Sequence, residues 1–268
     1  MNIKLVAFDL DGTIYTDKVS EKVKLAFLKL KEKDIKILPI TGRSLRSTLE
    51  ILDLAGIKED QRELASLTTG ALVQDLNTKV VHNSNFLNRS NYFALKKLEN
   101  RNIHLSVYTT DKLYYTYLSE ELLVDAKALK DDLVKIEDEN MLSNDICRFN
   151  FMGNKEDLTE FENKYRSQLE KDFYVVRNIP ISLELLSKKS SKANSLEYVM
   201  NYYKLNKDEV LAIGDGNNDI SMFQLVENSV AMGNAKESVK KYARYITDTV
   251  ENDGFYTILK KLKIIDED

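Results

Sequence analysis

A short apolar stretch near the start of the chain ends in two carboxylates, and this feature constrains the fold most strongly. Residues 4–8 read Lys-Leu-Val-Ala-Phe and predict a buried parallel strand, which Asp9 and Asp11 follow directly. Two carboxylates at the end of a core strand are costly unless a cation lies beside them. Mg²⁺ is a suitable cation because it binds oxygen ligands and keeps positions for water or a substrate phosphate. The segment therefore predicts a metal site that binds and processes phosphate groups.

The composition indicates a globular protein without a basic surface. The chain has 268 residues with 43% hydrophobic content, enough for one large domain or two smaller ones, and we expect two. The net charge is −4 and the charges are interspersed, so nucleic acid is not an expected partner. Cys147 is the single cysteine and can form no internal disulfide. Because the opening resembles no signal peptide and no uncharged run reaches about 18 residues, we expect a cytoplasmic protein without a membrane partner.

Helix and strand patterns alternate at both ends of the chain. The spacing of apolar residues predicts, in order, elements at 4–8, 23–30, 36–40, 44–56, 196–203, 210–213, 219–226 and 229–232. This alternation is typical of βαβ units, which form a parallel sheet with helices on both faces. Both ends of the chain are therefore expected to build one doubly wound sheet.

The pattern changes between about residues 83 and 185. Hairpin-like neighbouring strands separated by helices favour an antiparallel sheet covered on one face. The expected strands lie at 104–109, 113–117, 148–152, 173–176 and 181–186, and the expected helices at 92–99, 120–130 and 158–169. We therefore predict an α/β, Rossmann-like core from residues 1–82 and 186–268, with an α+β domain of residues 83–185 inserted into it.

Four segments place polar groups where ligands of open α/β sheets bind, beyond the carboxyl ends of the strands. They are Asp9 with Asp11, then Thr41-Gly42-Arg43, then Lys192 at a helix start, and finally the run 214–219, Gly-Asp-Gly-Asn-Asn-Asp. In this order they resemble the haloacid dehalogenase-like (HAD) phosphatase superfamily, and their spacing resembles its Cof-type branch, which carries a large cap domain. The resemblance covers nearly the whole chain and is strongest at 212–222, continuing through 230–235 and 252–254.

The chemistry of the carboxylates can be argued from the residues. A carboxylate beside a metal is a competent nucleophile toward phosphorus, so Asp9 could form an aspartyl-phosphate, and the resemblance gives the first aspartate this role. Asp11 shares a face with Asp9 and is placed to protonate the leaving oxygen and later to accept a proton from water. The resemblance implies that the Asp11 backbone carbonyl binds the metal. Asp215 would supply another oxygen, and Asp219 would support the ion directly or through a neighbour.

Other polar residues are expected to hold the phosphate, whose developing charge needs donors and cations. Thr41 and the backbone N–H of Gly42 can donate hydrogen bonds. Lys192 would neutralise the phosphate, and Asn218 matches the family position that touches it. Arg43 has two open interpretations, because it either contacts substrate or braces the loop through an acidic neighbour. In one departure from the pattern of many relatives, Thr69-Gly70-Ala71 stands where they have Asn-Gly-Ala, which could alter a contact on the substrate side.

The expected function is Mg²⁺-dependent hydrolysis of a small phosphorylated metabolite, such as a sugar phosphate, beneath a cap that excludes bulk water. A phosphomutase or phosphotransferase would use the same four segments and pass the phosphoryl group to a sugar hydroxyl. A catalytically silent relative that binds a metabolite would lack the nucleophile or the lysine, and this chain has both. No feature of the sequence indicates an oligomeric state.

Overall fold

The computed structural model describes residues 1–130 and 132–266. Contacts divide the chain into two compact units, which we call the core unit (residues 1–42, 48–83 and 191–268) and the cap unit (residues 43–47 and 84–190). The sequence predicts boundaries after residues 82 and 185, whereas the contacts place them after Asn83 and Ser190 and add the segment 43–47 to the cap unit. Within the described ranges, none of the helices is both long and apolar enough to cross a bilayer.

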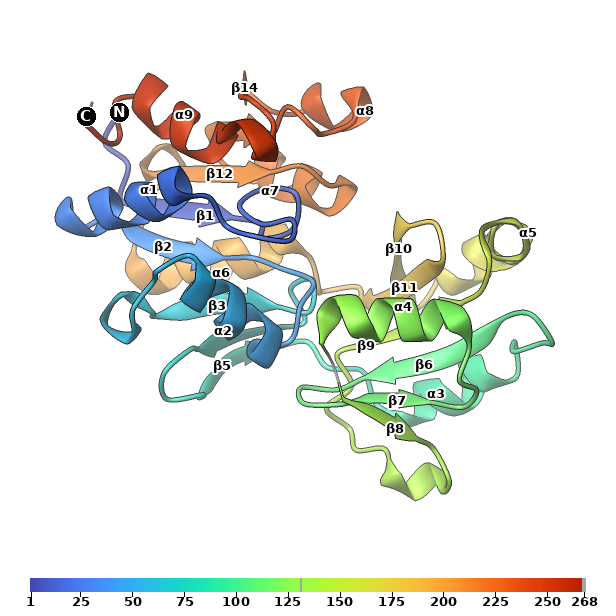
Figure 1. Cartoon of the computed structure of the whole chain (residues 1–268). Helices are drawn as coiled ribbons and strands as arrows, with labels where there is room; N and C mark the ends of the chain where they lie inside the picture. Colours follow the sequence, from blue (N-terminus) through green and yellow to red (C-terminus); the bar gives the residue numbers. More distant parts are fainter. Residues whose placement is uncertain (131, 267–268) are drawn as a thin grey trace. The chain divides into compact units, whose positions relative to one another are not determined.

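A five-stranded sheet in the order β14-β13-β12-β1-β2 forms the centre of the core unit (Figure 1). Its strands are β1 (Leu5–Phe8), β2 (Lys36–Pro39), β12 (Val210–Gly214), β13 (Asn228–Ala231) and β14 (Tyr245–Ile246). All four pairings are parallel, which confirms the predicted sheet type. Because β1 and β12 are neighbours from opposite ends of the sequence, the strand order reverses between them, and their carboxyl ends are the expected ligand position.

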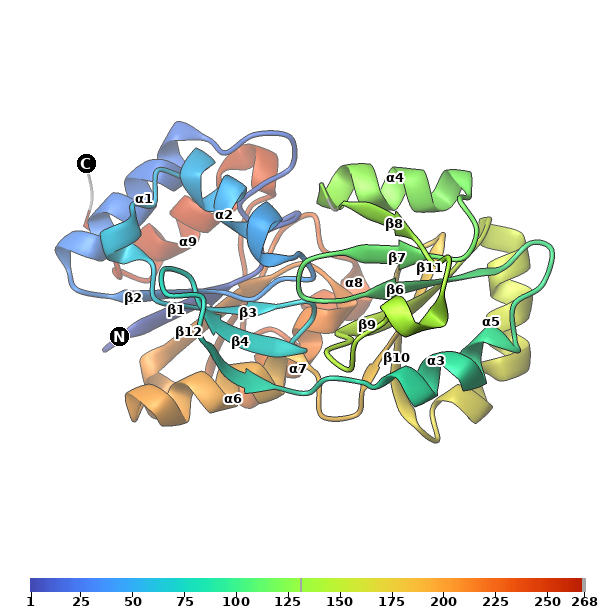
Figure 2. The same ribbon diagram turned by 90° about the horizontal axis from the view of Figure 1, so that it is seen from below.

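Helices cover both faces of this sheet, and the alternation of side chains along β1 explains how. Leu5 and Ala7 pack in one core cluster with residues of α6 (Lys192–Tyr203) and α7 (Ile220–Leu225). On the other face, the ring of Phe8 lies 5.2 Å from that of Phe27 in α1 (Glu21–Glu32) and 5.6 Å from that of Phe255 in α9 (Gly254–Lys261). Figure 2 shows α1 and α9 on one side of the sheet and α6 and α7 on the other. The other α-helices with residues in the core unit are α2 (Leu45–Leu54), which begins in the segment 43–47 of the cap unit, and α8 (Glu237–Lys240).

A second sheet of three strands extends the core unit beside β2. It consists of β3 (Leu64–Leu67), β4 (Leu72–Asp75) and β5 (Val81–Ser84), and the sequence pattern had indicated no element in this region. The backbone N–H of Thr41 donates to the carbonyl of Ser66 over 2.9 Å, and this hydrogen bond connects the segment after β2 to β3.

The turn between β3 and β4 holds two threonines in a conformation that β-branched residues rarely adopt. Thr68 and Thr69 have φ angles of 49° and 56°, followed by Gly70 at 82°. Thr69 is buried, and its N–H donates to the carbonyl of Thr41 over 2.9 Å. A side chain at Gly70 would clash with the backbone of Ser191, because a Cβ there would lie 2.3 Å from its carbonyl oxygen. Tertiary contacts therefore hold a strained turn against local preference.

We predict that Thr69→Asn stabilises the protein. Asparagine adopts the left-handed region more readily than threonine, and the gain should be about 1 kcal/mol in the free energy of unfolding. Chemical denaturation of wild type and variant measures it. Thr257→Asn in helix α9 is the control, since threonine and asparagine have similar helix propensities. A decrease in stability for Thr69→Asn would contradict the strain assigned to the turn.

The cap unit is built on a six-stranded sheet in the order β10-β11-β9-β6-β7-β8. The strands are β6 (His104–Tyr108), β7 (Leu113–Tyr115), β8 (Leu133–Lys135), β9 (Arg148–Met152), β10 (Phe173–Ile179) and β11 (Ser182–Ser187). Its pairs are antiparallel except β7 with β8, which is parallel. One face packs against α3 (Arg89–Lys96) and α5 (Lys155–Leu169) in a cluster that includes Leu105, Phe149 and Leu183.

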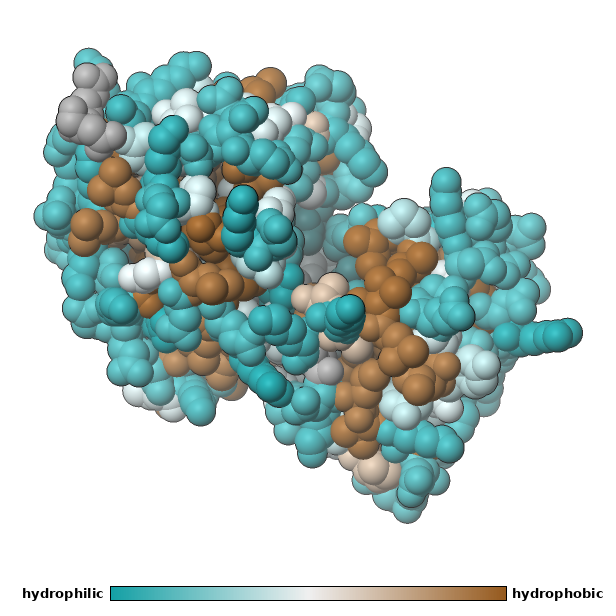
Figure 3. All heavy atoms as spheres, in the orientation of Figure 1, coloured by the Kyte–Doolittle hydropathy of each residue, from teal (hydrophilic) through white to brown (hydrophobic). Residues whose placement is uncertain are grey.

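Helix α4 (Glu120–Leu129) lies on the opposite face of the cap sheet, where Leu122 and Ala126 pack against Tyr108 and Leu113 (Figure 2). The expectation of a sheet covered on one face is therefore wrong for this part of it. Figure 3 shows apolar side chains gathered at the surface where Figure 1 places α4. Leu123 and Val124 contribute to this surface with exposed fractions of 46% and 60%. The helix is thus apolar both toward the sheet and toward solvent.

Candidate active site

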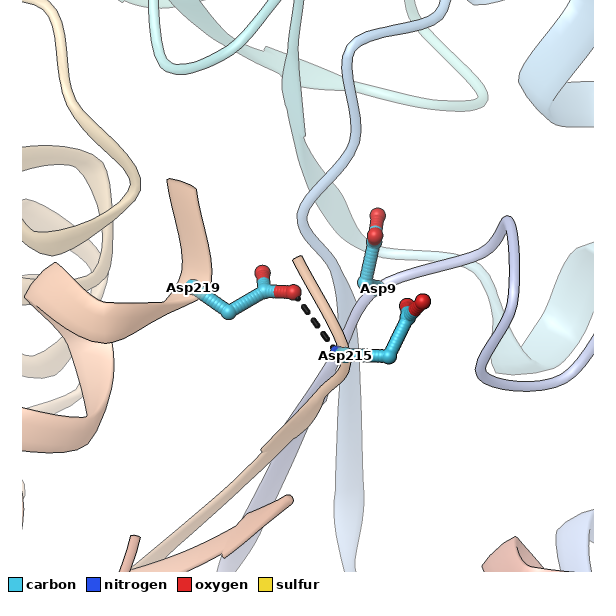
Figure 4. Close-up of side chains that lie close together, drawn as sticks. All are labelled: Asp9, Asp215 and Asp219. Carbon is cyan, nitrogen blue, oxygen red and sulfur yellow. Dashed lines mark hydrogen bonds between the residues drawn. The ribbon is translucent and has the colours of Figure 1, made fainter. Parts of the chain in front are cut away.

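Asp9, Asp215 and Asp219 lie together at the carboxyl ends of β1 and β12 (Figure 4). Each offers a carboxylate oxygen, and these oxygens lie within 4.8 Å of one another. Asp9 follows β1, Asp215 follows the last residue of β12, and Asp219 ends the short 3₁₀ helix Asn217–Asp219. The reversal of strand order between β1 and β12 therefore places these three acidic side chains in one cluster.

Lys192 is the cation at this cluster. It is buried at the first position of α6, and its Nζ lies 2.9 Å from Asp9 Oδ1 and 2.6 Å from Asp219 Oδ1. Burial alone would lower the pKa of Lys192, but the charges of Asp219 and Asp9 and their hydrogen bonds hold it above its usual value. A cation at a helix N-terminus is opposed by the helix dipole, so the two carboxylates must also offset that repulsion.

Removing this cation should destabilise the protein strongly. Lys192→Met leaves two buried carboxylates facing each other, and breaking a buried ion pair on one side costs about 3–5 kcal/mol. We expect a loss of at least about 3 kcal/mol in urea denaturation. Adding Asp219→Asn to Lys192→Met should recover part of the loss, because it removes one of the uncompensated charges. An additive double variant would contradict the coupling between the two side chains.

Asp219 uses both of its carboxylate oxygens within the protein. Oδ2 accepts the backbone N–H of Asp215 over 2.9 Å and that of Gly216 over 2.8 Å, and Oδ1 accepts Lys192. Gly214 makes room for this arrangement, since a Cβ there would lie 2.3 Å from the Asp219 carboxyl carbon. With three donors already bound, Asp219 is better suited to orient the loop at Asp215 than to bind an ion itself.

Two side chains hold Asp215 from opposite sides, and its carboxylate oxygens can still bind a further donor or cation. Thr13 Oγ1 donates to its Oδ1 over 3.2 Å, and Asn234 Nδ2 lies 3.3 Å from its Oδ2. Gly12, with φ of 75°, allows the close approach, because a Cβ at that position would lie 2.4 Å from Asp215 Oδ2. Burial raises the pKa of Asp215 to about 7, and the charge of Asp219 adds to the increase.

The cluster carries more negative charge than its lysine balances. Burial raises the pKa of Asp9 well above the usual value, Lys192 opposes this, and the charges of Asp219 and Asp215 raise it further. Three carboxylates thus share one buried ammonium, so the ionised cluster has an excess of negative charge. Carboxylate oxygens are the ligands that hard divalent cations prefer. The donor set therefore fits a cation bound by Asp9 and Asp215.

Asn234 is a site residue to which the sequence analysis assigned no role. Besides its contact with Asp215, its Nδ2 donates to the carbonyl of Gly12 over 2.8 Å, and its Oδ1 accepts the N–H of Val250 over 3.0 Å. One amide thus links the loops after β1, β12 and β13 with the start of the 3₁₀ helix Val250–Asn252. Asn234 lies in the stretch 230–235, where the resemblance to the family is strong. This resemblance is the sequence feature that could have identified Asn234 as a site residue.

We predict that Asn234→Leu weakens the binding of a divalent cation. The variant removes the two donors that orient Gly12 and Asp215, and losing such outer partners typically lowers metal affinity about 10–100-fold. Titration of Mg²⁺ followed by isothermal calorimetry measures the effect directly. Asn163→Leu, on the exposed surface of α5, provides a matched control. Equal Mg²⁺ affinity in both variants and wild type would show that Asn234 does not position the site.

Asp11 and Asn218 lie near this cluster without joining the group of three carboxylates. Asp11 is exposed in the loop after β1, where it forms a bridge with Tyr15, and its charge contributes to the raised pKa of Asp9. Its side chain therefore faces solvent close to the cluster. The Asn218 side chain lies against Gly216, where a Cβ would be 2.6 Å from Asn218 Oδ1.

The predicted segment 41–43 lies in the loop between β2 and α2. Thr41 is buried, and α2 begins at Leu45, next to the predicted start at residue 44. Arg43 is buried, and its Nη1 donates to Ser47 Oγ over 2.6 Å and to the carbonyl of Ala128 over 2.9 Å. A hydroxyl and a carbonyl are thus among the partners of Arg43, and both interpretations of this residue stay predictions.

A family model described as haloacid dehalogenase-like hydrolase matches residues 6–259. The chain belongs to this family. Two Bacillus subtilis relatives are each 26% identical: phosphatase YwpJ, over 97% of this chain and all of that protein, and 5-amino-6-(5-phospho-D-ribitylamino)uracil phosphatase YcsE, over 95% and 93%. The solved structure of BT1666 from Bacteroides thetaiotaomicron, described among phosphatases of the superfamily, is 26% identical. The two structures superimpose with a TM-score of 0.82, and the match covers 98% of this chain and 96% of the BT1666 chain. This HAD hydrolase is therefore an enzyme by family, and its carboxylate cluster fits that assignment.

Proposed function

We propose that this hydrolase is a Mg²⁺-dependent phosphatase that acts on small phosphorylated metabolites through an aspartyl-phosphate on Asp9. The observation that carries the proposal is the placement of Asp9 at the end of β1, within 4.8 Å of Asp215 oxygen and 2.9 Å from the Lys192 amine. A buried carboxylate with a fixed cation on one oxygen is oriented and kept ionised when a second cation is present.

In the first step, an oxygen of Asp9 attacks the phosphorus of a phosphate monoester. The bond from phosphorus to the ester oxygen breaks as the bond to Asp9 forms, and Asp11 gives a proton to the leaving alcohol. Asp11 suits this role because its side chain is accessible to solvent and lies outside the group that would hold the cation. Lys192 and a donor from Thr41 or Gly42 would stabilise the charge on the phosphoryl oxygens.

In the second step, Asp11 takes a proton from a water molecule, and the resulting hydroxide attacks phosphorus. The bond to Asp9 breaks, inorganic phosphate leaves and both carboxylates return to their starting state. Asp9, Asp215 and the backbone carbonyl of Asp11 would hold Mg²⁺, which when bound offsets negative charge on the phosphate and on Asp9. Asp219 and Asn234 would keep Asp215 in place through the hydrogen bonds described above.

The proposed substrate class is supported by the relatives. YwpJ and YcsE are both named as phosphatases, and the name of YcsE specifies a small molecule with a phosphorylated ribityl group. Of these two names, that of YcsE specifies a small phosphorylated metabolite, and this supports the proposed substrate class.

Asp9→Asn should abolish the hydrolysis of para-nitrophenyl phosphate, because an amide is not a competent nucleophile toward phosphorus. Wild type should be inactive with a chelator and regain activity on addition of Mg²⁺. Asp17→Asn, at an exposed position of the same loop, is the control and should remain active. The readout is release of nitrophenolate, with trapping of ³²P-labelled protein after acid quench as a second measure. Substantial activity of Asp9→Asn would reject the nucleophile, and transfer to added sugars with little free phosphate would indicate a phosphotransferase.

A further inference from the structure

Helix α4 of the cap unit exposes a stripe of four side chains along its solvent face. Glu120, Leu123, Val124 and Lys127 recur at spacings of three and four residues, which places them on one side of the helix. All four are exposed, and the exposed fractions of Leu123 and Val124 are 46% and 60%. We call these four residues the α4 stripe. Its middle is apolar, and its two ends carry opposite charges.

The α4 stripe is not needed to hold the helix in the cap unit. Leu122 and Ala126, on the other side of α4, already pack against the cap sheet. Leu118, directly before the helix, is 45% exposed, and Figure 3 shows apolar side chains gathered on this surface. Single exposed apolar residues are common, but neighbouring ones that form a patch mark an interaction surface.

The order of the residues makes the α4 stripe complementary to itself. When two copies of α4 pack antiparallel about a twofold axis between Leu123 and Val124, Leu123 of each copy meets Val124 of the other. Glu120 and Lys127 are equally far from that axis along the helix, so each Glu120 faces a Lys127 of the other copy. Within one chain they lie about two helical turns apart, and neither has an ion-pair partner among the described residues.

We infer that two copies of this chain form a dimer through the α4 stripe. The charge complementarity identifies the second copy as the occupant, because a twofold axis pairs every charge of the stripe with its opposite. An anionic membrane surface fits the stripe poorly, since Glu120 opposes the single lysine. Helix α4 has ten residues and is about 15 Å long, so the contact is smaller than a standard interface of about 1,600 Å². We therefore expect a weak dimer, with a Kd on the order of 10 µM.

Charge reversal tests the pairing of the two ends. Sedimentation velocity over a series of protein concentrations measures the Kd of the dimer. Glu120→Lys and Lys127→Glu should each raise the Kd about tenfold, because the twofold axis turns two attractions into two repulsions. An equimolar mixture of these two variants should associate as wild type does, since opposite charges face each other again. Glu156→Lys, which removes an exposed acid from the first turn of α5, is the matched control and should keep the wild-type Kd.

The apolar middle of the stripe provides a second test. Leu123→Asp buries a charge at the twofold axis and should give a monomer at every concentration. Leu28→Asp is the control, because Leu28 lies on α1 with an exposed fraction of 52% and should not affect the dimer. Circular dichroism establishes that each variant is folded, and the mixture of charge variants decides the question if Leu123→Asp is not.

Two outcomes would overturn the inference. A wild type that stays monomeric throughout the concentration series would assign the α4 stripe to a different protein. A dimer with the same Kd in Leu123→Asp and in both charge reversals would use another surface. Neither result depends on phosphatase activity, so the dimer and the proposed function are tested separately.

Discussion

The buried ammonium of Lys192 between Asp9 and Asp219 is the interaction on which the rest of the site depends. It joins the end of β1, the start of α6 and the loop after β12, which are distant in sequence. Neither carboxylate could be buried at this position without the lysine, and the lysine could not be buried without them. Because Asp215 adds a further carboxylate, the cluster contains three carboxylates beside one ammonium. The arrangement that joins these distant segments therefore also forms a cluster that could hold a metal ion.

Close approach between loops is the second requirement, and it explains why small residues surround the carboxylates. Gly12 and Gly214 leave room for the carboxyl groups of Asp215 and Asp219, since a Cβ at either position would overlap them. Thr13 and Asn234 then bind Asp215 from opposite sides. A carboxylate confined by packing and by directed hydrogen bonds loses little further freedom when it binds an ion, which is the physical meaning of a preorganised site.

Runs of apolar residues predicted β1, β12 and β13 of the central sheet well because every residue of these strands is buried, whereas the short, partly exposed β14 was not predicted. The pattern of α1 identified its buried residues, and the run of β12 identified a core strand. The strands β3 and β4 were missed because the turn between them places Thr68 and Thr69 in the left-handed region, which threonine rarely adopts. Tertiary contacts with Thr41 and Ser191 determine the conformation of the turn at residues 68–70, and such contacts leave no local pattern in the sequence.

The candidate site shows a similar division between residue identity and residue role. Motif spacing named Asp9, Asp215, Asp219 and Lys192, but the number of donors bound by Asp219 depends on loop geometry that spacing does not encode. In the cap, the alternation of β9 as Arg-Phe-Asn-Phe-Met predicts one apolar and one polar face, and a polar face is ordinarily solvated. Here Arg148 and Asn150 are buried instead. Burial of this polar face depends on tertiary packing, which leaves no local pattern in the sequence.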